Sequence, residues 1–523
     1  MPIITKSRLF FTLIFLLAFF LRAYRIDFME FKADEALNTF LITRAHFGNP
    51  IPPGGTVSSV GILNPPLFTY LLLPITLFTV SPVWIALTIA LANSLAVSSL
   101  FLIISRFYNK TIGIFASLLL CMSPWHIIYS RKIWTQNLLF PLAVLLFYSL
   151  HSAVIQKKQY SWIYAGLSLM LMAQLHQGSI LLLILFIIYS LLSRIHVSWK
   201  HFIFGVLLGA LPLIPYLFFQ LTKLCIGCAA YTASSHPLNL TLLTHLILPS
   251  GIFGFSGFDV LLGNDFTLFT NTYFPISLTR YFTYPILLLT FFGAFIHWRS
   301  QKKLRILTFL YVALPSSFVL LRFDIFMHYY LPLLPLTALF IGIAFYTCIT
   351  CKNSLIRIGG YFLFLSLSLS YILFSLALHS FIAIHKEIHG EYGRVFLLSK
   401  AVAESKLRER KRDIAYKEMV IASYVPLQSV IGPETIARVV YDPVQTKKNL
   451  PTLEKNLLNR PFDDRILLEL TAFYTQKPIT FKTLSLLSQK SKINPGYIPI
   501  FNAIADKYIN ENNINREKLN FIL

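Results

Sequence analysis

Charged residues are scarce in this sequence. Of its 523 residues only 13% are Asp, Glu, Lys or Arg, whereas 56% are hydrophobic. Soluble domains carry about 25% charged residues, so this composition excludes an ordinary soluble protein and indicates a polytopic membrane protein. The formal net charge of +23 would also suit a nucleic-acid-binding protein. However, the basic residues cluster between apolar runs, where the positive-inside rule places them, and we therefore expect no nucleic-acid partner.

Acidic residues are rarest where the apolar runs are longest: seven precede residue 383, and the other 15 of the 22 follow it. A membrane-spanning helix needs about 20 mostly apolar residues. The runs predict an all-α protein with about eleven transmembrane helices, near 8–22, 82–104, 111–129, 137–153, 160–176, 179–193, 201–221, 281–298, 305–321, 331–350 and 358–382. The first run lacks a small-residue cleavage site, so we interpret it as an uncleaved span.

The charges between these spans predict an orientation. With a cytoplasmic N-terminus, the inner connections carry basic residues and no acid. All seven early acids then fall in outer loops: Asp27, Glu30, Asp34, Glu35, Asp259, Asp265 and Asp324. The basic bias sets the orientation, and the acids are a secondary check. We therefore expect a multi-pass plasma membrane protein with an extracytoplasmic C-terminal region.

Two outer loops are long enough to hold a site. The first, 22–81, contains the apolar stretch 64–79, which opens Asn-Pro-Pro and is interpreted as an interfacial helix. The second covers 223–280 and is either a mobile flap or a linker. Together with the spans they make up a transmembrane domain, 1–383. Residues 384–523 are predicted to form a small soluble α or α+β domain, with helices near 395–411 and 503–511 and a strand within 419–423.

Cysteine is also rare, with five residues that include two CxxC pairs. The predicted topology places Cys225/Cys228 and Cys348/Cys351 on opposite sides of the membrane, so the pairs cannot share one zinc ion. We interpret them as incidental apolar residues. A local disulfide between Cys225 and Cys228 is the alternative if that side is oxidising.

The stretch Phe31-Lys32-Ala33-Asp34-Glu35 places two adjacent carboxylates near the membrane surface. An acid beside a bilayer is costly unless it is used or paired, so Asp34 and Glu35 are candidate catalytic residues. One of them could act as a general base while the other pairs with a cation or helps to hold a divalent metal ion. Alternatively, both cap a helix that begins near Ala33.

Basic and aromatic residues gather at the outer ends of other spans. Arg131, Lys132 and Arg322 are candidates for binding a phosphate at the membrane surface. Snorkelling towards lipid headgroups is the alternative for each of them. His176, His328 and Tyr329 are candidate substrate contacts, and His176 could instead be a metal ligand or a structural residue.

These residues form an ordered set that resembles the C-type polytopic glycosyltransferases, which use polyprenyl-phosphate sugars. The nearest relatives are bacterial protein O-mannosyltransferase-like and aminoarabinose-transferase-like proteins. The matching pieces are Leu21-Arg22, Asp34-Glu35, Asn64-Pro65-Pro66-Leu67, Ser123-Pro124-Trp125-His126 through Ser130-Arg131, Gln174-Leu175-His176, His328-Tyr329-Tyr330-Leu331-Pro332 and Glu391-Tyr392-Gly393.

The resemblance implies an inverting transfer from a lipid-phosphate sugar, in which Asp34 activates the acceptor and Glu35 lies beside it. One departure concerns the second active-site loop, which often carries another acid in the family. Here the stretch reads Trp134-Thr135-Gln136-Asn137. Metal dependence therefore stays open, because relatives differ in this respect.

We thus expect an enzyme that transfers a hexose or pentose from a polyprenyl-phosphate donor to a protein, a lipid or a cell-envelope glycan on the outer face. A transporter or flippase of lipid-linked glycans is the alternative. Transporters more often place polar residues and broken helices near the bilayer midplane, whereas here the polar groups gather at the outer ends. A scaffold that presents the C-terminal region would leave the ordered loop motifs unexplained.

Overall fold

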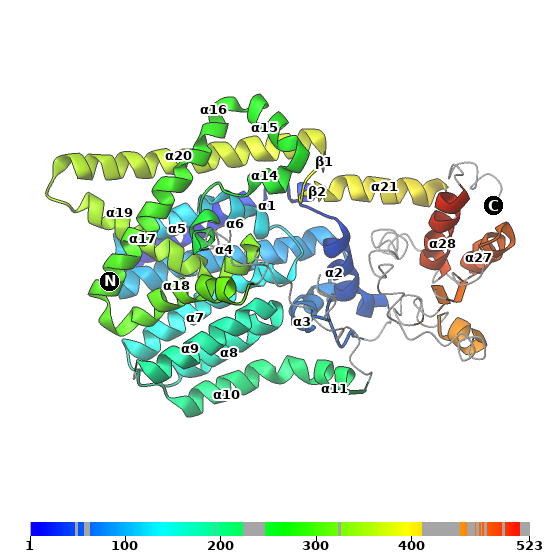
Figure 1. The fold of residues 1–523 in the computed structure, drawn as a ribbon, viewed down its shortest axis with the longest axis horizontal. Helices are drawn as coiled ribbons and strands as arrows, with labels where there is room; N and C mark the ends of the chain where they lie inside the picture. The colour runs from blue at the N-terminus through cyan, green and yellow to red at the C-terminus, as the bar shows by residue number, and fades with distance from the viewer. Residues whose placement is uncertain are drawn as a thin grey trace.

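The computed structural model describes residues 2–47, 51–56, 63–193, 195–222, 246–322, 326–409, 450–457, 479–493 and 497–512, with single positions between 466 and 474. Most of these residues are helical, and the all-α polytopic membrane architecture expected from the composition is confirmed (Figure 1). Within the described ranges, seven helical segments are long and apolar enough to cross a membrane.

The helices follow the predicted spans closely. Their bounds are α1 Pro2–Ala23, α4 Pro82–Phe107, α5 Lys110–Met122, α7 Leu139–Val154, α8 Ser161–Leu175, α9 Ile180–Leu192, α10 Trp199–Ala210, α11 Ile214–Thr222, α17 Thr283–Ser300, α18 Arg305–Leu320, α19 Leu334–Ile349 and α20 Ser354–His385. Helices α10 and α11 are joined through the 3-10 turn Leu211–Leu213 and together occupy one predicted span.

The third predicted span, 111–129, is wrong as a continuous helix. Helix α5 ends at Met122, and a separate short helix, α6, covers Pro124–Tyr129. Ser123 has an extended backbone with ψ 121°, because the ring of the following Pro124 disfavours helical geometry at the preceding residue. This break redirects the chain towards the loop that carries Arg131 and Lys132.

The first outer loop folds into short helices. Helix α2 (Ala33–Thr43) begins at the paired acids. The segment after Asn-Pro-Pro forms α3 (Leu67–Leu72) and the 3-10 helix Leu73–Leu77, with Pro66 as the α3 N-cap. These helices are too short to span a bilayer, as the prolines predicted. They lie at the end of the bundle from which α21 (Phe396–Glu409) leads away (Figure 1).

The second outer loop is built from small helices where it is described: α13 Leu248–Gly251, α14 Phe258–Leu262, α15 Phe266–Thr272 and α16 Phe274–Ser277. Cys225 and Cys228 lie outside the described residues, as does the predicted strand within 419–423. Cys348 and Cys351, at the end of α19, are free thiols.

A hairpin after the last span ties the loops together. We call residues 386–396 the strap. It contains β1 (Glu387–Ile388) and β2 (Gly393–Arg394), which pair antiparallel. Beyond the hairpin, the Phe31 N–H donates to the Arg394 carbonyl at 2.8 Å, and the Phe396 N–H donates to the Met29 carbonyl at 2.9 Å. On its other side, the strap's Tyr392 N–H donates to the Leu261 carbonyl at 2.9 Å. The strap therefore joins both long outer loops.

The C-terminal residues contain a second apolar cluster. Helices α27 (Phe481–Ile493) and α28 (Tyr497–Asn512) bury Leu484, Leu487, Ile500 and Ile504 together. The predicted helices near 395–411 and 503–511 correspond to α21 and α28, while α27 was not predicted. The domain boundary at 383/384 stays a prediction.

Close contact between α8 and α10 gives a test of the fold. A Cβ at Gly205 would lie 2.0 Å from the Ile163 carbonyl oxygen, so Gly205→Ala should push these helices apart. We expect a loss of roughly 1–3 kcal/mol, the usual cost of overpacking. Thermal unfolding of the detergent-purified protein measures it. Gly359→Ala is the control, because nothing lies within 4 Å of its added methyl group. Equal melting temperatures would contradict the close packing.

Candidate active site

The site is built on the first turn of α2. Lys32 is the N-cap residue, and its backbone N–H donates to the Glu35 Oε2 at 3.0 Å in a capping box. The Glu35 side chain is completely buried. Asp34, by contrast, is exposed. The two adjacent acids thus differ in environment: Glu35 serves as the cap that the alternative interpretation expected, whereas Asp34 is accessible to solvent.

Lys132 lies between two buried acids. Its Nζ is 2.7 Å from the Glu30 Oε1 and 3.3 Å from the Glu35 Oε1. The Lys32 Nζ approaches the same Glu30 oxygen at 2.9 Å. Burial raises the pKa of Glu30 to about 7, although Lys132 opposes this shift. For Lys132, burial lowers the pKa, but Glu30 and Glu35 outweigh burial and the net shift is upward. The result is a buried network of alternating charges directly behind Asp34.

The loop after α6 holds Lys132 in place through amide side chains. The Asn137 Nδ2 donates to the Lys132 carbonyl at 2.6 Å, and the Asn38 Nδ2 of α2 donates to the Ile133 carbonyl at 3.2 Å. From α4, the Asn93 Nδ2 donates to the Asn137 carbonyl at 3.0 Å. Hydrogen bonds from two helices, α2 and α4, therefore hold this loop in place. They fix the backbone at Lys132 although the loop itself contains no acidic residue.

An aromatic wall lies beside the acids. The Trp134 ring lies 4.2 Å from the Lys132 Nζ and 4.5 Å from the His328 ring. His176 packs edge-to-face on His328 at 5.6 Å and on Tyr329 at 4.3 Å. The His176 Nδ1 is buried with no hydrogen-bond partner. The three predicted substrate contacts therefore lie together and are joined to the acidic cluster through Trp134.

The environment of Asp34 suits a base. Burial by neighbouring atoms and the Glu35 carboxylate raise the pKa of Asp34, while Lys132, Lys32 and a hydrogen bond from Trp134 oppose the shift. A carboxylate whose pKa lies above its ordinary value is a stronger base. Asp34 combines an exposed carboxylate with this upward shift.

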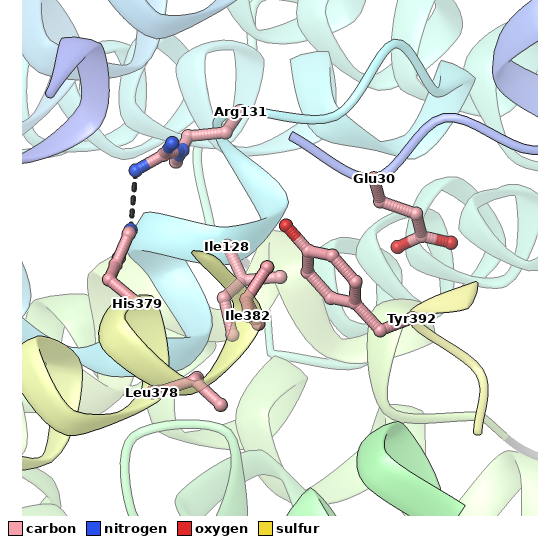
Figure 2. Close-up of a pocket in the computed structure, with 7 residues that line it drawn as sticks. All are labelled: Glu30, Ile128, Arg131, Leu378, His379, Ile382 and Tyr392. Atoms are coloured by element: carbon pink, nitrogen blue, oxygen red, sulfur yellow. Dashed lines mark hydrogen bonds between the residues drawn. The ribbon is translucent and has the colours of Figure 1, made fainter. Parts of the chain in front are cut away.

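The other predicted cations differ from Lys132 in their setting. Arg131 is 4% exposed, and its guanidinium contacts the His379 ring and donates to the Arg25 carbonyl at 2.5 Å. Figure 2 shows Arg131 and His379 on one side of a small cavity that Glu30 and Tyr392 also line. Arg322 lies on an exposed turn after α18 with φ 57°. Arg131 is thus next to the acidic cluster, whereas no contact of Arg322 with it is present in the described residues.

Several residues of the site were not among the sequence-based candidates. Glu30 and Lys32 surround Lys132, and Trp134 links it to the histidines. From the strap, the Tyr392 hydroxyl donates to the Phe28 carbonyl at 2.5 Å, and the Lys32 Nζ donates to the Glu391 carbonyl. The sequence could have identified Glu30 as a candidate, since it is one of only seven acidic residues before residue 383.

Comparisons with known proteins give a family match and matches to solved structures. The model of the family described as dolichyl-phosphate-mannose-protein mannosyltransferase matches residues 64–219. ArnT from Cupriavidus metallidurans in the apo state superimposes with a TM-score of 0.51 at 11% identity, covering 80% of this chain and 84% of that chain. The family model thus matches part of the region that carries the predicted resemblance, and the ArnT superposition shows a shared fold.

A second structure of ArnT from the same organism, bound to undecaprenyl phosphate, gives a TM-score of 0.48 at 14% identity and covers 86% of this chain and 81% of that chain. Comparison with curated protein sequences gives no match. The family match includes Lys132, Trp134 and His176 but not Asp34. The contacts of Lys132 with Glu35 connect the matched region to the acids of the first loop.

The donor groups present do not converge on a metal ion. Within the described ranges, no three His, Cys, Asp or Glu side chains are grouped so that they could hold one. Glu35, a possible ligand, has its oxygens directed to the Lys32 N–H and the Lys132 ammonium. Both Glu35 oxygens thus face nitrogen atoms of the chain itself.

Proposed function

We propose that this chain is a membrane glycosyltransferase that moves a sugar from a polyprenyl-phosphate-linked donor to an acceptor at the outer face of the plasma membrane. The acceptor would be a hydroxyl or amine of a protein, a lipid or a cell-envelope glycan. The observation that carries this proposal is the exposed Asp34 carboxylate, backed by the Glu30–Lys132–Glu35 network and flanked by the aromatic wall.

The proposed reaction needs one base. Asp34 takes the proton from the acceptor, whose oxygen or nitrogen attacks the anomeric carbon while the bond to the lipid phosphate breaks. The phosphate leaves with the bonding electrons, and inversion follows from attack on the opposite face. A phosphate is already a good leaving group, so catalysis depends on activating the acceptor and on positioning both substrates.

Each remaining residue has a proposed role. Glu35 and Lys132 keep the first turn of α2 in place, so that Asp34 points outwards. Rings of the aromatic wall stack on the sugar, with His176, His328 and Tyr329 as contacts. Arg131, Lys132 and Arg322 remain the proposed sources of positive charge for the donor phosphate. Lys32 joins them because its side chain is 36% exposed.

Sugar release from a panel of radiolabelled polyprenyl-phosphate sugars tests the function. Protein purified in detergent would be incubated with each donor, with candidate acceptors and with or without divalent metal. Release from one donor would support the proposal and identify the sugar. Absence of release from every donor, together with movement of labelled lipid across vesicles that contain the protein, would favour a flippase instead.

Arg131→Ala should weaken donor binding selectively. Losing a buried charge beside the acidic cluster is expected to raise the donor KM roughly tenfold, because a hydrogen bond to a charged group contributes about 1.5–3 kcal/mol. Initial rates at varied donor and acceptor concentrations separate the two constants. Arg280→Ala, at an exposed arginine that packs on Tyr281, is the matched control. An unchanged donor KM, or an equal rise in the acceptor KM, would contradict this role.

A further inference from the structure

Glu30 lies at the centre of the contacts behind Asp34, although it is separated from its main partner by 102 residues of sequence. Its carboxylate is 3% exposed and is the nearest acid to the Lys132 ammonium, at 2.7 Å against 3.3 Å for Glu35. The Lys132 Nζ in turn lies 4.2 Å from the centre of the Trp134 ring. A cation held in this way restricts the indole, because cation–π attraction favours one position of the ring.

The backbone around Glu30 is fixed from the far end of the chain. Glu30 forms an isolated antiparallel bridge with Val395 of the strap. Hydrogen bonds from Phe31 and Phe396 flank the bridge at 2.8 and 2.9 Å. The Ser399 hydroxyl also donates to the Phe31 carbonyl at 3.1 Å. The backbone of Glu30 is therefore held in place. Its carboxylate can in turn fix the position of the long, flexible Lys132 side chain.

We propose that Glu30 is a positioning residue: its carboxylate holds the Lys132 ammonium against Trp134 and so fixes the indole beside Asp34 and the aromatic wall. This inference rests on the proposed glycosyl transfer for its catalytic consequence. The geometric part, that Glu30 controls the Trp134 ring, stands on the contacts alone. Trp134 contacts the Lys132 ammonium on one side and packs on the His328 ring on the other.

Several titratable groups surround Glu30. The titratable groups that face it come from every surrounding segment: Lys32, Glu35, Tyr129, Lys132 and Tyr392, with Arg131 and His379 lining the same cavity. Lys32 and Lys132 both pair with Glu30, and Lys132 also pairs with Glu35. Removing the Glu30 charge takes away the carboxylate nearest to the Lys132 ammonium, so the ammonium is no longer held against the Trp134 ring.

Glu30→Gln tests the proposal. We expect kcat to fall on the order of tenfold with the donor KM unchanged, because the ring beside Asp34 is no longer held in place. Glu30→Asp retains the carboxylate on a shorter side chain, so kcat should fall less than in Glu30→Gln. Glu387→Gln is the control, since Glu387 forms an exposed ion pair with Arg394 on the same strap.

A spectroscopic readout separates this inference from the proposed function. The difference in fluorescence between each protein and its Trp134→Phe counterpart isolates Trp134, and acrylamide quenching of that difference should increase in Glu30→Gln. If wild type transfers no sugar from any donor, the proposed function fails, and quenching still decides whether Glu30 holds the ring. Unchanged quenching would overturn the proposal, as would a lower melting temperature with kcat as in wild type.

Discussion

Asp34→Asn is expected to reduce sugar transfer by about 10²–10⁴-fold, the usual contribution of a general base. The amide is nearly the same size but cannot accept the acceptor's proton. Because Asp34 is exposed and forms none of the ion pairs of the buried network, the variant should remain folded. Release of labelled sugar by wild type and variant, at saturating donor and acceptor, measures the effect on kcat.

The matched control is Asp259→Asn, an exposed acid of α14 on the same predicted face. It should retain wild-type turnover. The pH dependence gives a second check, because kcat/KM should fall as the pH falls through the pKa of Asp34. This fall should occur above pH 3.8, the ordinary pKa of an aspartate, because burial and Glu35 raise the pKa of Asp34. Normal turnover by Asp34→Asn would exclude Asp34 as the base.

Lys132→Met is expected to have the largest effect on stability. The substitution leaves the buried Glu30 and Glu35 carboxylates without their shared ammonium, and breaking a buried ion pair by removing one partner costs about 3–5 kcal/mol. Lys32 still pairs with Glu30, but its contact with Glu35 is through the backbone N–H. Thermal unfolding of the purified proteins in one detergent measures the loss.

A double variant and a pH series sharpen this test. Combining Lys132→Met with Glu30→Gln removes one of the two carboxylates left without an ammonium partner. The double variant should therefore recover part of the lost stability. The pKa of Glu30, about 7 in the wild type, rises further in Lys132→Met because Lys132 no longer opposes the shift. The penalty is therefore present in full above that pKa and is relieved as Glu30 is protonated. The difference in melting temperature from wild type should therefore narrow towards pH 5. A constant difference, or none, would contradict the paired-charge network.

Much of the membrane architecture was predictable because one force dominates it. Long apolar runs must be helical in a bilayer, where backbone groups find no water. The ranges near 82–104 and 331–350 therefore correspond closely to α4 and α19. The exception is the range 111–129, which was predicted as one continuous helix because the residues on both sides of Ser123-Pro124 are apolar. A local backbone restriction ended α5 there although the side chains on both sides are apolar.

The candidate site was only partly predictable. Asp34, Glu35 and Lys132 could be singled out because charges at the end of an apolar span are unusual. The different roles of Asp34 and Glu35 could not be predicted, because two adjacent helix residues differ only in the direction in which their side chains point. Glu35 turns inwards to cap α2 and meet Lys132, and Asp34 turns outwards. The contact of Arg131 with His379 could not be predicted for the same reason.

By itself the sequence determined that this chain is a polytopic helical membrane protein with an acidic pair near one end of its spans, because hydropathy and charge are properties of each residue. Only the tertiary structure decided which charges meet. The strap and the first loop are brought together by hydrogen bonds between residues as far as 367 positions apart, as between Phe396 and Met29. Backbone pairing of this kind leaves no periodicity in either segment. Glu30 therefore takes its position behind Asp34 only in the folded chain, where the strap that follows the last span contacts the first outer loop.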